Sequence, residues 1–388
     1  MAHATASVVS SKQSEARNNI GTSEHLGALD GLRGLMALWV VLGHACTKTG
    51  MTFLPIVRSP HYAVDGFMLL SGFLMTYHYA LRAAKEPWSS PHTWLIFYIR
   101  RFFRISPLYY VSLLPAYALY TQFRDWSEAI HAKVGGAGAL SSPPLGVTHI
   151  VLHLTYLFGL APTYHSSLIV PDWSLSLEMQ FYLVFPFLML LAARFGWVSL
   201  AAVAAGAWLW ATSRFGIAQF FTQPSPLPMS LLWFVIGMLW AKAYLSREDR
   251  RQTWMVVGAA ALALVPRDAH DIALVATFAW VLFSGEAFWL GRLAGRARTA
   301  LSGRVGKFMA DASYSVYLTH LMFLTPISYF LLKYEGIGPV YRFAIAASAT
   351  ILLSYGAARP LKVIEDHGIS AGRLLVRRIS PMQTSNQK

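Results

Sequence analysis

Residues 29–48 read LDGLRGLMALWVVLGHACTK, an apolar segment that carries Arg33 near its start and His44 near its end. The hydrocarbon core of a bilayer is about 30 Å thick, so a crossing helix needs about 20 mainly apolar residues. An ionisable side chain inside such a helix is costly and generally faces a protein interior or a wet cavity. The segment therefore predicts a transmembrane helix with two ionisable side chains, each a candidate for a functional role.

Arg33 and His44 are eleven residues apart. That separation is within roughly 20° of three full helical turns, so both side chains share one face with about 16 Å of rise between them. Arg33 is alternatively an interfacial residue whose head group reaches the membrane surface. His44 is either a neutral packing residue or a general base, because an unperturbed imidazole titrates near neutral pH.

The rest of the chain repeats the apolar pattern, with 55% hydrophobic and only 13% charged residues. This composition excludes an ordinary soluble domain and predicts an all-α, polytopic integral membrane bundle of ten or eleven transmembrane helices. The candidate spans are 33–48, 62–81, 105–122, 146–162, 174–193, 195–212, 228–245, 254–266, 271–290, 310–332 and 340–357. The predicted organisation is a disordered cytoplasmic tail over 1–28, a membrane domain over 29–360 and a cytoplasmic C-terminal tail over 361–388.

The formal net charge of +14 fits a lipid bilayer better than a nucleic acid as the partner, because basic residues gather in the cytoplasmic loops of membrane proteins. Basic residues lie between the second and third spans and again before the tenth. The loop from Lys242 to Arg251 is also basic, yet the odd number of predicted spans from the third to the seventh places it outside. One segment there is miscounted, re-entrant or an exception.

Neither a disulfide nor a metal site is predicted. Cys46 is the one cysteine, and the 13 histidines are scattered along the chain. His149 and His153 are four residues apart but have no evident third ligand, so we interpret them as packing or interface residues. No cofactor is expected.

The sequence YIRRFFRISPLYY over 98–110 places Arg101 and Arg104 three residues apart, on one helical face. Two guanidinium groups so placed suit a phosphate or a carboxylate. The alternative is a positive-inside anchor at the membrane surface.

Two further spans contain buried acids. The sequence PDWSLSLEMQFYLVFP over 171–186 holds Glu178 shortly after Trp173, where the span begins, and AVDGFMLLSGFLM over 63–75 holds Asp65. Glu178 and Asp172 either pair with arginines to fix helix packing or have a functional role. Gly66 and Gly72 permit close helix approach.

The sequence DASYSVYLTHLMF over 311–323 aligns Ser313, Tyr317 and His320 on one helical face. These side chains form either an interhelical packing set or part of a binding site.

Five of these motifs, in this order, resemble the membrane-bound acyltransferase-3 family: DGLRGLMALWVVLGH, VDGFMLLSGFLM, RRFFRISPLYY, WSLSLEMQFYLVFP and SYSVYLTH. The resemblance runs from about Asp30 to about residue 360. It implies a multi-pass protein of the bacterial inner membrane with about ten helices. Such a protein takes an acyl group, usually acetyl, from cytoplasmic acyl-CoA as co-substrate to a hydroxyl of a glycan or glycolipid.

The resemblance also assigns residues. The family's Arg and His fall on Arg33 and His44, its arginine pair on Arg101 and Arg104, and its acidic residue on Glu178. We expect His44 and Glu178 to be catalytic, with His44 as the general base. Substrate binding is expected from Arg33, Arg101, Arg104, Asp65, Trp173 and His320.

Two other classes of protein would also carry polar groups within spans. A secondary transporter or flippase for a glycan or lipid-linked precursor would consume no acyl-CoA. A membrane sensor or structural protein would tolerate single substitutions at these groups. Within the enzyme class, the acyl group is alternatively succinyl or longer, and the acceptor a macrolide or a lipid.

Overall fold

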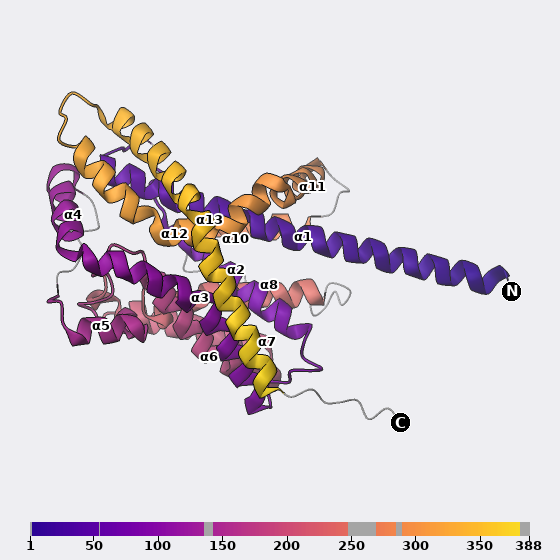
Figure 1. The fold of residues 1–388 in the computed structure, drawn as a ribbon. Coiled ribbons are helices and arrows are strands. Elements are labelled where there is room, and N and C mark those ends of the chain that lie inside the picture. Colours follow the sequence, from indigo (N-terminus) through magenta and orange to yellow (C-terminus); the bar gives the residue numbers. More distant parts are fainter. Residues whose placement is uncertain (1, 54, 136–142, 247–268, 285–288, 381–388) are drawn as a thin grey trace.

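A computed structural model describes the backbone of residues 2–53, 55–135, 143–246, 269–284 and 289–380, and the side chains of these ranges from Leu26 onward. Within the described residues the chain forms twelve α-helices and two short 3-10 helices, and no strand (Figure 1). The all-α prediction is confirmed for these ranges. The predicted span over 254–266 and the residues 381–388 lie outside them.

The helices follow one another through short connections. Their bounds are α1 Ala2–Thr49, α2 His61–Ala80, α3 Pro91–Ala118, α4 Tyr120–Val134, α5 Val147–Leu154, α6 Trp173–Phe195, α7 Trp197–Thr212, α8 Leu227–Leu245, α10 Ala269–Phe283, α11 Trp289–Ser302, α12 Arg304–Leu331 and α13 Pro339–Ile379. The 3-10 helices are η1 Leu157–Leu160 and η2 Ala218–Phe220.

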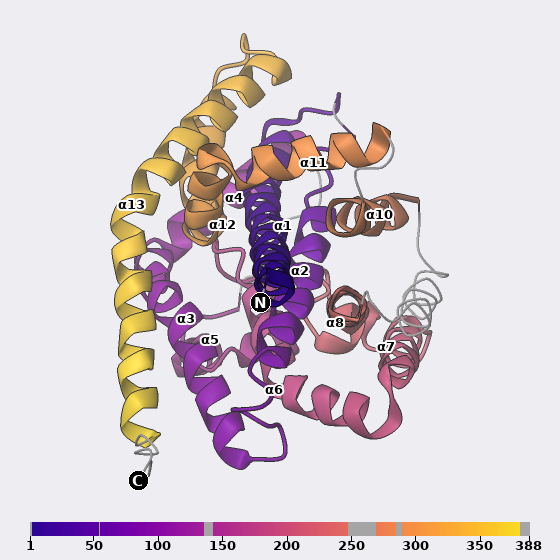
Figure 2. The same cartoon turned by 90° about the vertical axis from the view of Figure 1, so that its right-hand side faces the viewer.

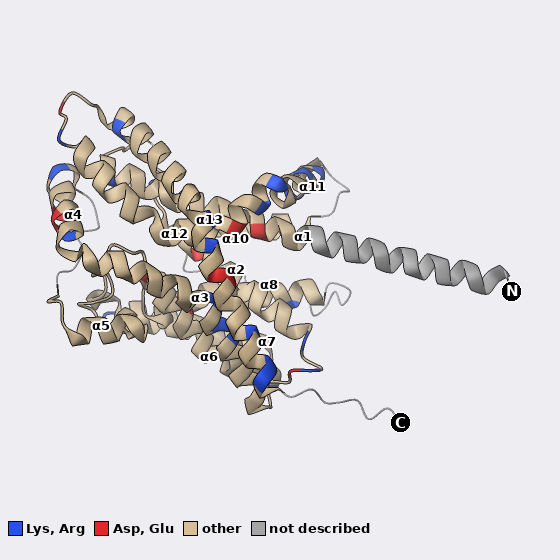
Figure 3. Ribbon diagram, in the orientation of Figure 1, with Lys and Arg blue, Asp and Glu red and all other residues tan. Residues whose placement is uncertain are grey.

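Several helices have the length and apolar composition needed to cross a membrane. In the described part of the chain four meet both criteria, namely Leu26–Thr49 within α1, α6, α8 and α13. Two shorter apolar helices are Trp197–Thr212 and His270–Phe283. Long stretches of helix surface carry no charged side chain (Figure 3). The architecture is therefore a membrane helical bundle, and the count of ten or eleven crossings stays a prediction.

The single span predicted over 146–162 was wrong. Helix α5 ends at Leu154, the chain reverses through Tyr156 at a φ of 62°, and the short η1 follows. The Tyr156 hydroxyl lies 3.0 Å from the Ser106 hydroxyl of α3, which anchors this turn in the core. Removing one crossing makes the number of spans before the basic 242–251 loop even. With one crossing fewer, the positive-inside rule predicts that Lys242 is on the same side as the other basic loops.

Other helices extend beyond their predicted bounds. Helix α3 begins at Pro91, before the predicted span 105–122, so the arginines over 100–104 lie in the middle of this helix and not at its start. Helix α13 continues to Ile379, past residue 360, where we placed the start of the C-terminal tail. The backbone of α1 begins at Ala2. The cytoplasmic placement of both tails and the disorder of 1–28 stay predictions.

Helix α1 occupies the centre of the bundle and is seen nearly end-on in Figure 2. It packs against α2, α11, α12 and α13, and its contact with α12 is the most extensive between any two described helices. Helices α2 and α8 approach closely because two glycines face the opposing backbone. A Cβ at Gly72 would overlap the carbonyl oxygen of Phe234, and a Cβ at Gly237 would overlap that of Leu69. Small residues at such crossings allow the close contact that holds membrane helices together.

Candidate functional site

A cavity of about 550 Å³ lies among α1, α2, α3, α6, α12 and α13. Its wall is unusual for a membrane bundle because it gathers side chains of both charges. The ionisable residues that line it are Asp30, Arg33, Arg104, Glu178, Lys307, Asp311, Lys362 and Glu365. The volume is within the range of small-molecule sites, about 300–1,000 Å³. The cavity is the candidate site.

Three of the residues predicted to be catalytic or to bind substrate meet on this wall. Arg33 comes from α1, Arg104 from α3 and Glu178 from α6, so the fold brings together groups that are far apart in the chain. Each is half-buried. Two guanidinium groups and one carboxylate therefore face a shared internal space, in which charged groups interact more strongly than in water.

Glu178 is held in place from two helices. The Ser71 hydroxyl of α2 lies 3.2 Å from Oε1, and the Tyr182 hydroxyl, one turn further along α6, donates to the same oxygen. These donors offset part of the cost of placing a carboxylate in a bundle interior. The side chain is thus fixed in its orientation toward the cavity.

Arg101 and Arg104 do not form the single fork that their spacing suggested. Arg104 lines the cavity, whereas the Arg101 guanidinium lies over the rings of Tyr79, Phe97 and Tyr182 at 5.9, 5.9 and 5.7 Å from their centroids. These separations are within the range of cation–π attraction. Arg101 therefore reaches the site only indirectly, through Tyr182 and its bond to Glu178.

His44 does not line the cavity either, and its partner was not anticipated. Its Nδ1 lies 3.0 Å from Nε2 of His320 on α12, and the centroids of the two rings are 5.1 Å apart. His320 is fully buried. The sequence placed His320 among the substrate-binding residues, but in the structure it contacts the residue expected to be the base.

Tyr317 connects the histidine pair to the cavity. Its side chain lines the cavity, and its ring centroid is 6.1 Å from that of His320. Its hydroxyl lies 2.6 Å from the hydroxyl of Ser174, which also lines the cavity. The histidines are therefore one side chain behind the cavity wall.

Asp65 and Trp173 are beside the site and not on its wall. Asp65 is half-buried on α2 between the lining residues Val64 and Phe67. Trp173 is the first residue of α6, next to the lining residue Ser174, and packs against the main hydrophobic core. Their predicted substrate contacts stay predictions.

Sequence reasoning missed the basic and acidic groups that α12 and α13 contribute to the wall. Lys362 and Glu365 lie in the segment interpreted as a tail, and their side chains are 3.1 Å apart. Lys307 was interpreted only as a topology signal. The spacing of Lys362 and Glu365, three residues apart and hence on one helical face, was a detectable sign that the last helix continues.

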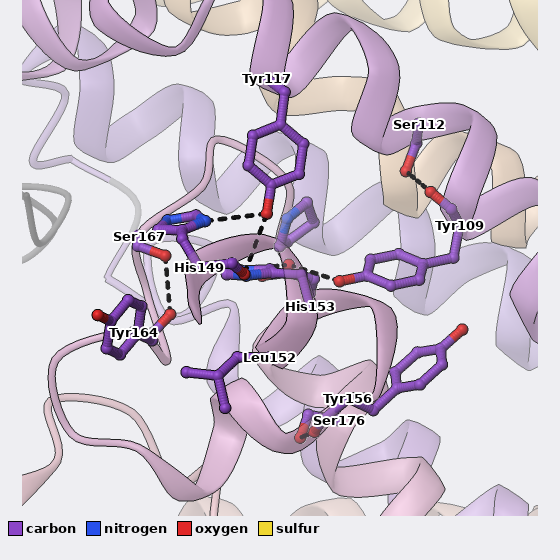
Figure 4. A network of polar contacts seen from close by, with 12 residues as sticks. Tyr109, Ser112, Tyr117, His149, Leu152, His153, Tyr156, Tyr164, Ser167 and Ser176 are labelled. Atoms are coloured by element: carbon purple, nitrogen blue, oxygen red, sulfur yellow. Dashed lines mark hydrogen bonds and ion pairs between the residues drawn. The ribbon is translucent and has the colours of Figure 1, made fainter. Parts of the chain in front are cut away.

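A second buried polar network lies around α5 (Figure 4). The Tyr117 hydroxyl is 2.9 Å from Nδ1 of His149, and His149 and His153 stack with ring centroids 4.6 Å apart. Nε2 of His153 is 3.6 Å from Oδ2 of Asp172, which also accepts a hydrogen bond from Tyr109. In the part of the chain that the structure describes, no three His, Cys, Asp or Glu side chains are grouped to hold a metal. This network fixes the turn before α6, consistent with a packing role.

Comparison with known proteins agrees with the resemblance. The model of a family described as an acyltransferase domain matches residues 26–359. Acyltransferase MdmB of Streptomyces mycarofaciens is 27% identical over 328 residues, covering 76% of this chain and 78% of that protein. Nose resistant to fluoxetine protein 6 of Caenorhabditis elegans is 26% identical over 134 residues, covering 28% of this chain and 16% of that protein. No solved structure matches. Because the family model spans most of the chain, this protein belongs to the acyltransferase-3 family of membrane acyltransferases.

Proposed function

We propose that this protein is an O-acyltransferase of the bacterial inner membrane that moves an acetyl group from cytoplasmic acetyl-CoA to a hydroxyl of a cell-surface or secreted glycan. His44 is the general base in this proposal. The observation that supports it most is the cavity whose wall carries four basic side chains and whose wall residue Tyr317 packs against the His320–His44 pair.

The basic side chains suit the donor. Coenzyme A carries several phosphate charges, which Arg and Lys attract and, in the case of Arg, bind in a bidentate manner. Arg33, Arg104 and Lys307 supply that charge from three different helices, and Lys362, which is 3.1 Å from Glu365, adds a fourth basic group to the wall. The thioester end of the donor then extends past Phe67 and Tyr317, which line the cavity with their rings 5.7 Å apart, toward the histidines.

The reaction needs a base because a sugar hydroxyl is a weak nucleophile. His44 takes the hydroxyl proton while the hydroxyl oxygen attacks the thioester carbonyl. The carbon–sulfur bond then breaks, and the imidazolium returns the proton to the departing thiolate. The products are the acetyl ester and free CoA, with no net gain or loss of protons and no need for a cofactor.

Glu178 contributes a fixed acceptor. Both described hydrogen bonds to its carboxylate go to Oε1, from Ser71 and Tyr182. Its other oxygen, Oε2, accepts a hydrogen bond from an N–H or O–H group of the substrate in the cavity. A carboxylate held by two donors keeps its orientation when substrate binds, which is the basis of preorganised catalysis.

The experiment is transfer of radiolabelled acetyl from acetyl-CoA into envelope glycan by membranes that contain the wild-type protein, with empty-vector membranes as control. We expect label in an alkali-labile ester of the glycan and release of one CoA thiol per label. Export of unlabelled glycan without loss of acetyl-CoA would overturn the proposal and indicate a transporter or flippase.

A further inference from the structure

The contact between His44 and His320 determines which nitrogen of His44 carries a hydrogen. Nδ1 of His320 lies 2.7 Å from the carbonyl oxygen of Tyr317 and 3.3 Å from that of Val316. Carbonyl oxygens only accept hydrogen bonds, so Nδ1 of His320 must be the protonated nitrogen. In a neutral imidazole the other nitrogen, Nε2, then has a lone pair and acts as an acceptor.

That acceptor faces His44. Nε2 of His320 is 3.0 Å from Nδ1 of His44, so Nδ1 of His44 must donate its hydrogen to this bond. The neutral His44 ring consequently has a lone pair on Nε2, the nitrogen on the far side from His320. This order of donors and acceptors begins at backbone atoms of α12, which cannot change their role.

From this geometry, and resting on the proposed function, we propose that His320 is a positioning residue that makes Nε2 of His44 the reacting nitrogen. When Nε2 of His44 takes the hydroxyl proton, Nδ1 keeps its hydrogen and the bond to His320 becomes charge-assisted. Hydrogen bonds of this kind are roughly twice as strong as neutral ones. His320 therefore stabilises the imidazolium without touching either substrate.

This role differs from substrate binding, and burial distinguishes the two. His320 is fully buried and does not line the cavity, whereas Ser313 and Tyr317 on the same face of α12 do. Its ring is fixed by its own helix through the Tyr317 carbonyl and by the hydrogen bond to His44. A group so enclosed influences the reaction through His44 alone.

The kinetic test compares His320→Leu with His320→Gln in purified protein reconstituted into nanodiscs. Leucine offers no acceptor, so we expect kcat to fall about 100-fold, within the range typical of acid–base catalysis, while KM for acetyl-CoA stays within about twofold. Glutamine presents an amide oxygen near the position of Nε2, so we expect kcat of His320→Gln to be about tenfold higher than kcat of His320→Leu. The melting temperature of each variant verifies folding. An unchanged kcat in folded His320→Leu, or a raised KM with unchanged kcat, would overturn the proposal.

A second measurement does not depend on activity. Solid-state ¹⁵N NMR of histidine-labelled protein distinguishes the protonated from the unprotonated ring nitrogen, and comparison with His44→Ala identifies the His44 signals. We expect Nδ1–H in the wild type and a larger share of the Nε2–H form in His320→Leu, in which the His44 ring keeps its hydrogen bond to the Val40 backbone. Nε2–H in the wild type would contradict the role of His320. Absence of acetyl transfer by the wild type, with Nδ1–H still observed, would instead count against the proposed function.

Discussion

Ser71 of α2 and Glu178 of α6 are joined by a 3.2 Å hydrogen bond at the wall of the charged cavity. The two residues are far apart in the sequence, so the bond depends on how the bundle places α2 beside α6. Hydrogen bonds to charged groups contribute about 1.5–3 kcal/mol. The orientation of the acidic group is therefore sensitive to a single hydroxyl on another helix.

Replacing Ser71 with alanine tests this relationship. We expect Ser71→Ala to lower kcat/KM for acetyl transfer about tenfold, because the carboxylate keeps only the Tyr182 donor. Ser112→Ala is the control, since the hydrogen bond that the described residues give this buried serine is to the carbonyl of Tyr109 in its own helix. Equal activity of the two variants would show that the bond to Ser71 has no part in the reaction.

Arg104 and Arg100 lie on the same helix but in different surroundings. Arg104 lines the cavity, whereas both terminal nitrogens of Arg100 are 2.7 Å from the carboxylate of Glu86. We expect Arg104→Gln to raise KM for acetyl-CoA about tenfold and to make it less sensitive to salt, because a phosphate partner is lost. Arg100→Gln should leave KM within about twofold. Donor titration at several salt concentrations measures both, and an equal effect of the two substitutions would argue against a donor site at Arg104.

The close crossing of α2 and α8 predicts a large stability difference between two glycine substitutions. At Gly72 an added Cβ would overlap the backbone of Phe234, while at Gly206 on α7 it would meet no atom within 4 Å. We expect Gly72→Ala to destabilise the fold by about 1–3 kcal/mol through overpacking. Gly206→Ala should be neutral or slightly stabilising, because alanine is the better helix former. Thermal unfolding in one detergent, followed by size-exclusion chromatography, gives the comparison. Similar melting temperatures would refute the close crossing.

The hydrogen bonds of His165, in the loop before α6, predict a contribution to stability that depends on pH. Its Nδ1 is 2.7 Å from the Pro162 carbonyl, and its Nε2 accepts hydrogen bonds from the hydroxyl and the backbone N–H of Thr222, at 2.8 and 3.2 Å. Burial lowers the pKa of His165 below the ordinary value of 6.5, because removal from water disfavours the charged imidazolium. The contribution of neutral His165 to the free energy of unfolding is thus complete above pH 6.5, and it is lost as the pH falls below that value.

The measurement is the melting temperature of the wild type and of His165→Gln between about pH 7.5 and about pH 5. We expect the wild type to exceed His165→Gln in melting temperature most at the highest pH, and this difference to shrink as the pH falls. His131→Gln, at an exposed position of α4, controls for general effects of removing a histidine. An advantage that does not change with pH would contradict the assignment.

The sequence predicted the helices, which follow from apolar periodicity, and several site residues, which follow from residue type. The all-helical fold and the bounds of α6 and α8 follow from apolar stretches of span length between turn residues. Arg33 and Glu178 were identified because charged groups within spans are costly, and Arg104 because of its spacing from Arg101. The three do share one cavity. Spacing alone could not show that Arg101, three residues from Arg104, faces aromatic rings and not the cavity.

What the sequence could not supply are contacts between distant helices. The pairing of His44 with His320 joins α1 to α12, and no local pattern specifies which face of one helix meets the other. Likewise, the sequence around Lys362 and Glu365 is typical of a charged tail, whereas in the structure these residues belong to α13 and line the cavity. The span predicted over 146–162 failed for a similar reason, because the turn at Tyr156 depends on its bond to Ser106 in another helix.

The central claim is that His44 is the base in transfer of an acetyl group from acetyl-CoA. The most direct measurement is kcat of purified wild-type and His44→Ala protein with acetyl-CoA and a glycan acceptor, alongside binding of acetyl-CoA to both. We predict that His44→Ala binds the donor normally, because His44 does not line the cavity, and loses at least about 100-fold in kcat. A folded His44→Ala protein that transfers acetyl at the wild-type rate would contradict the claim.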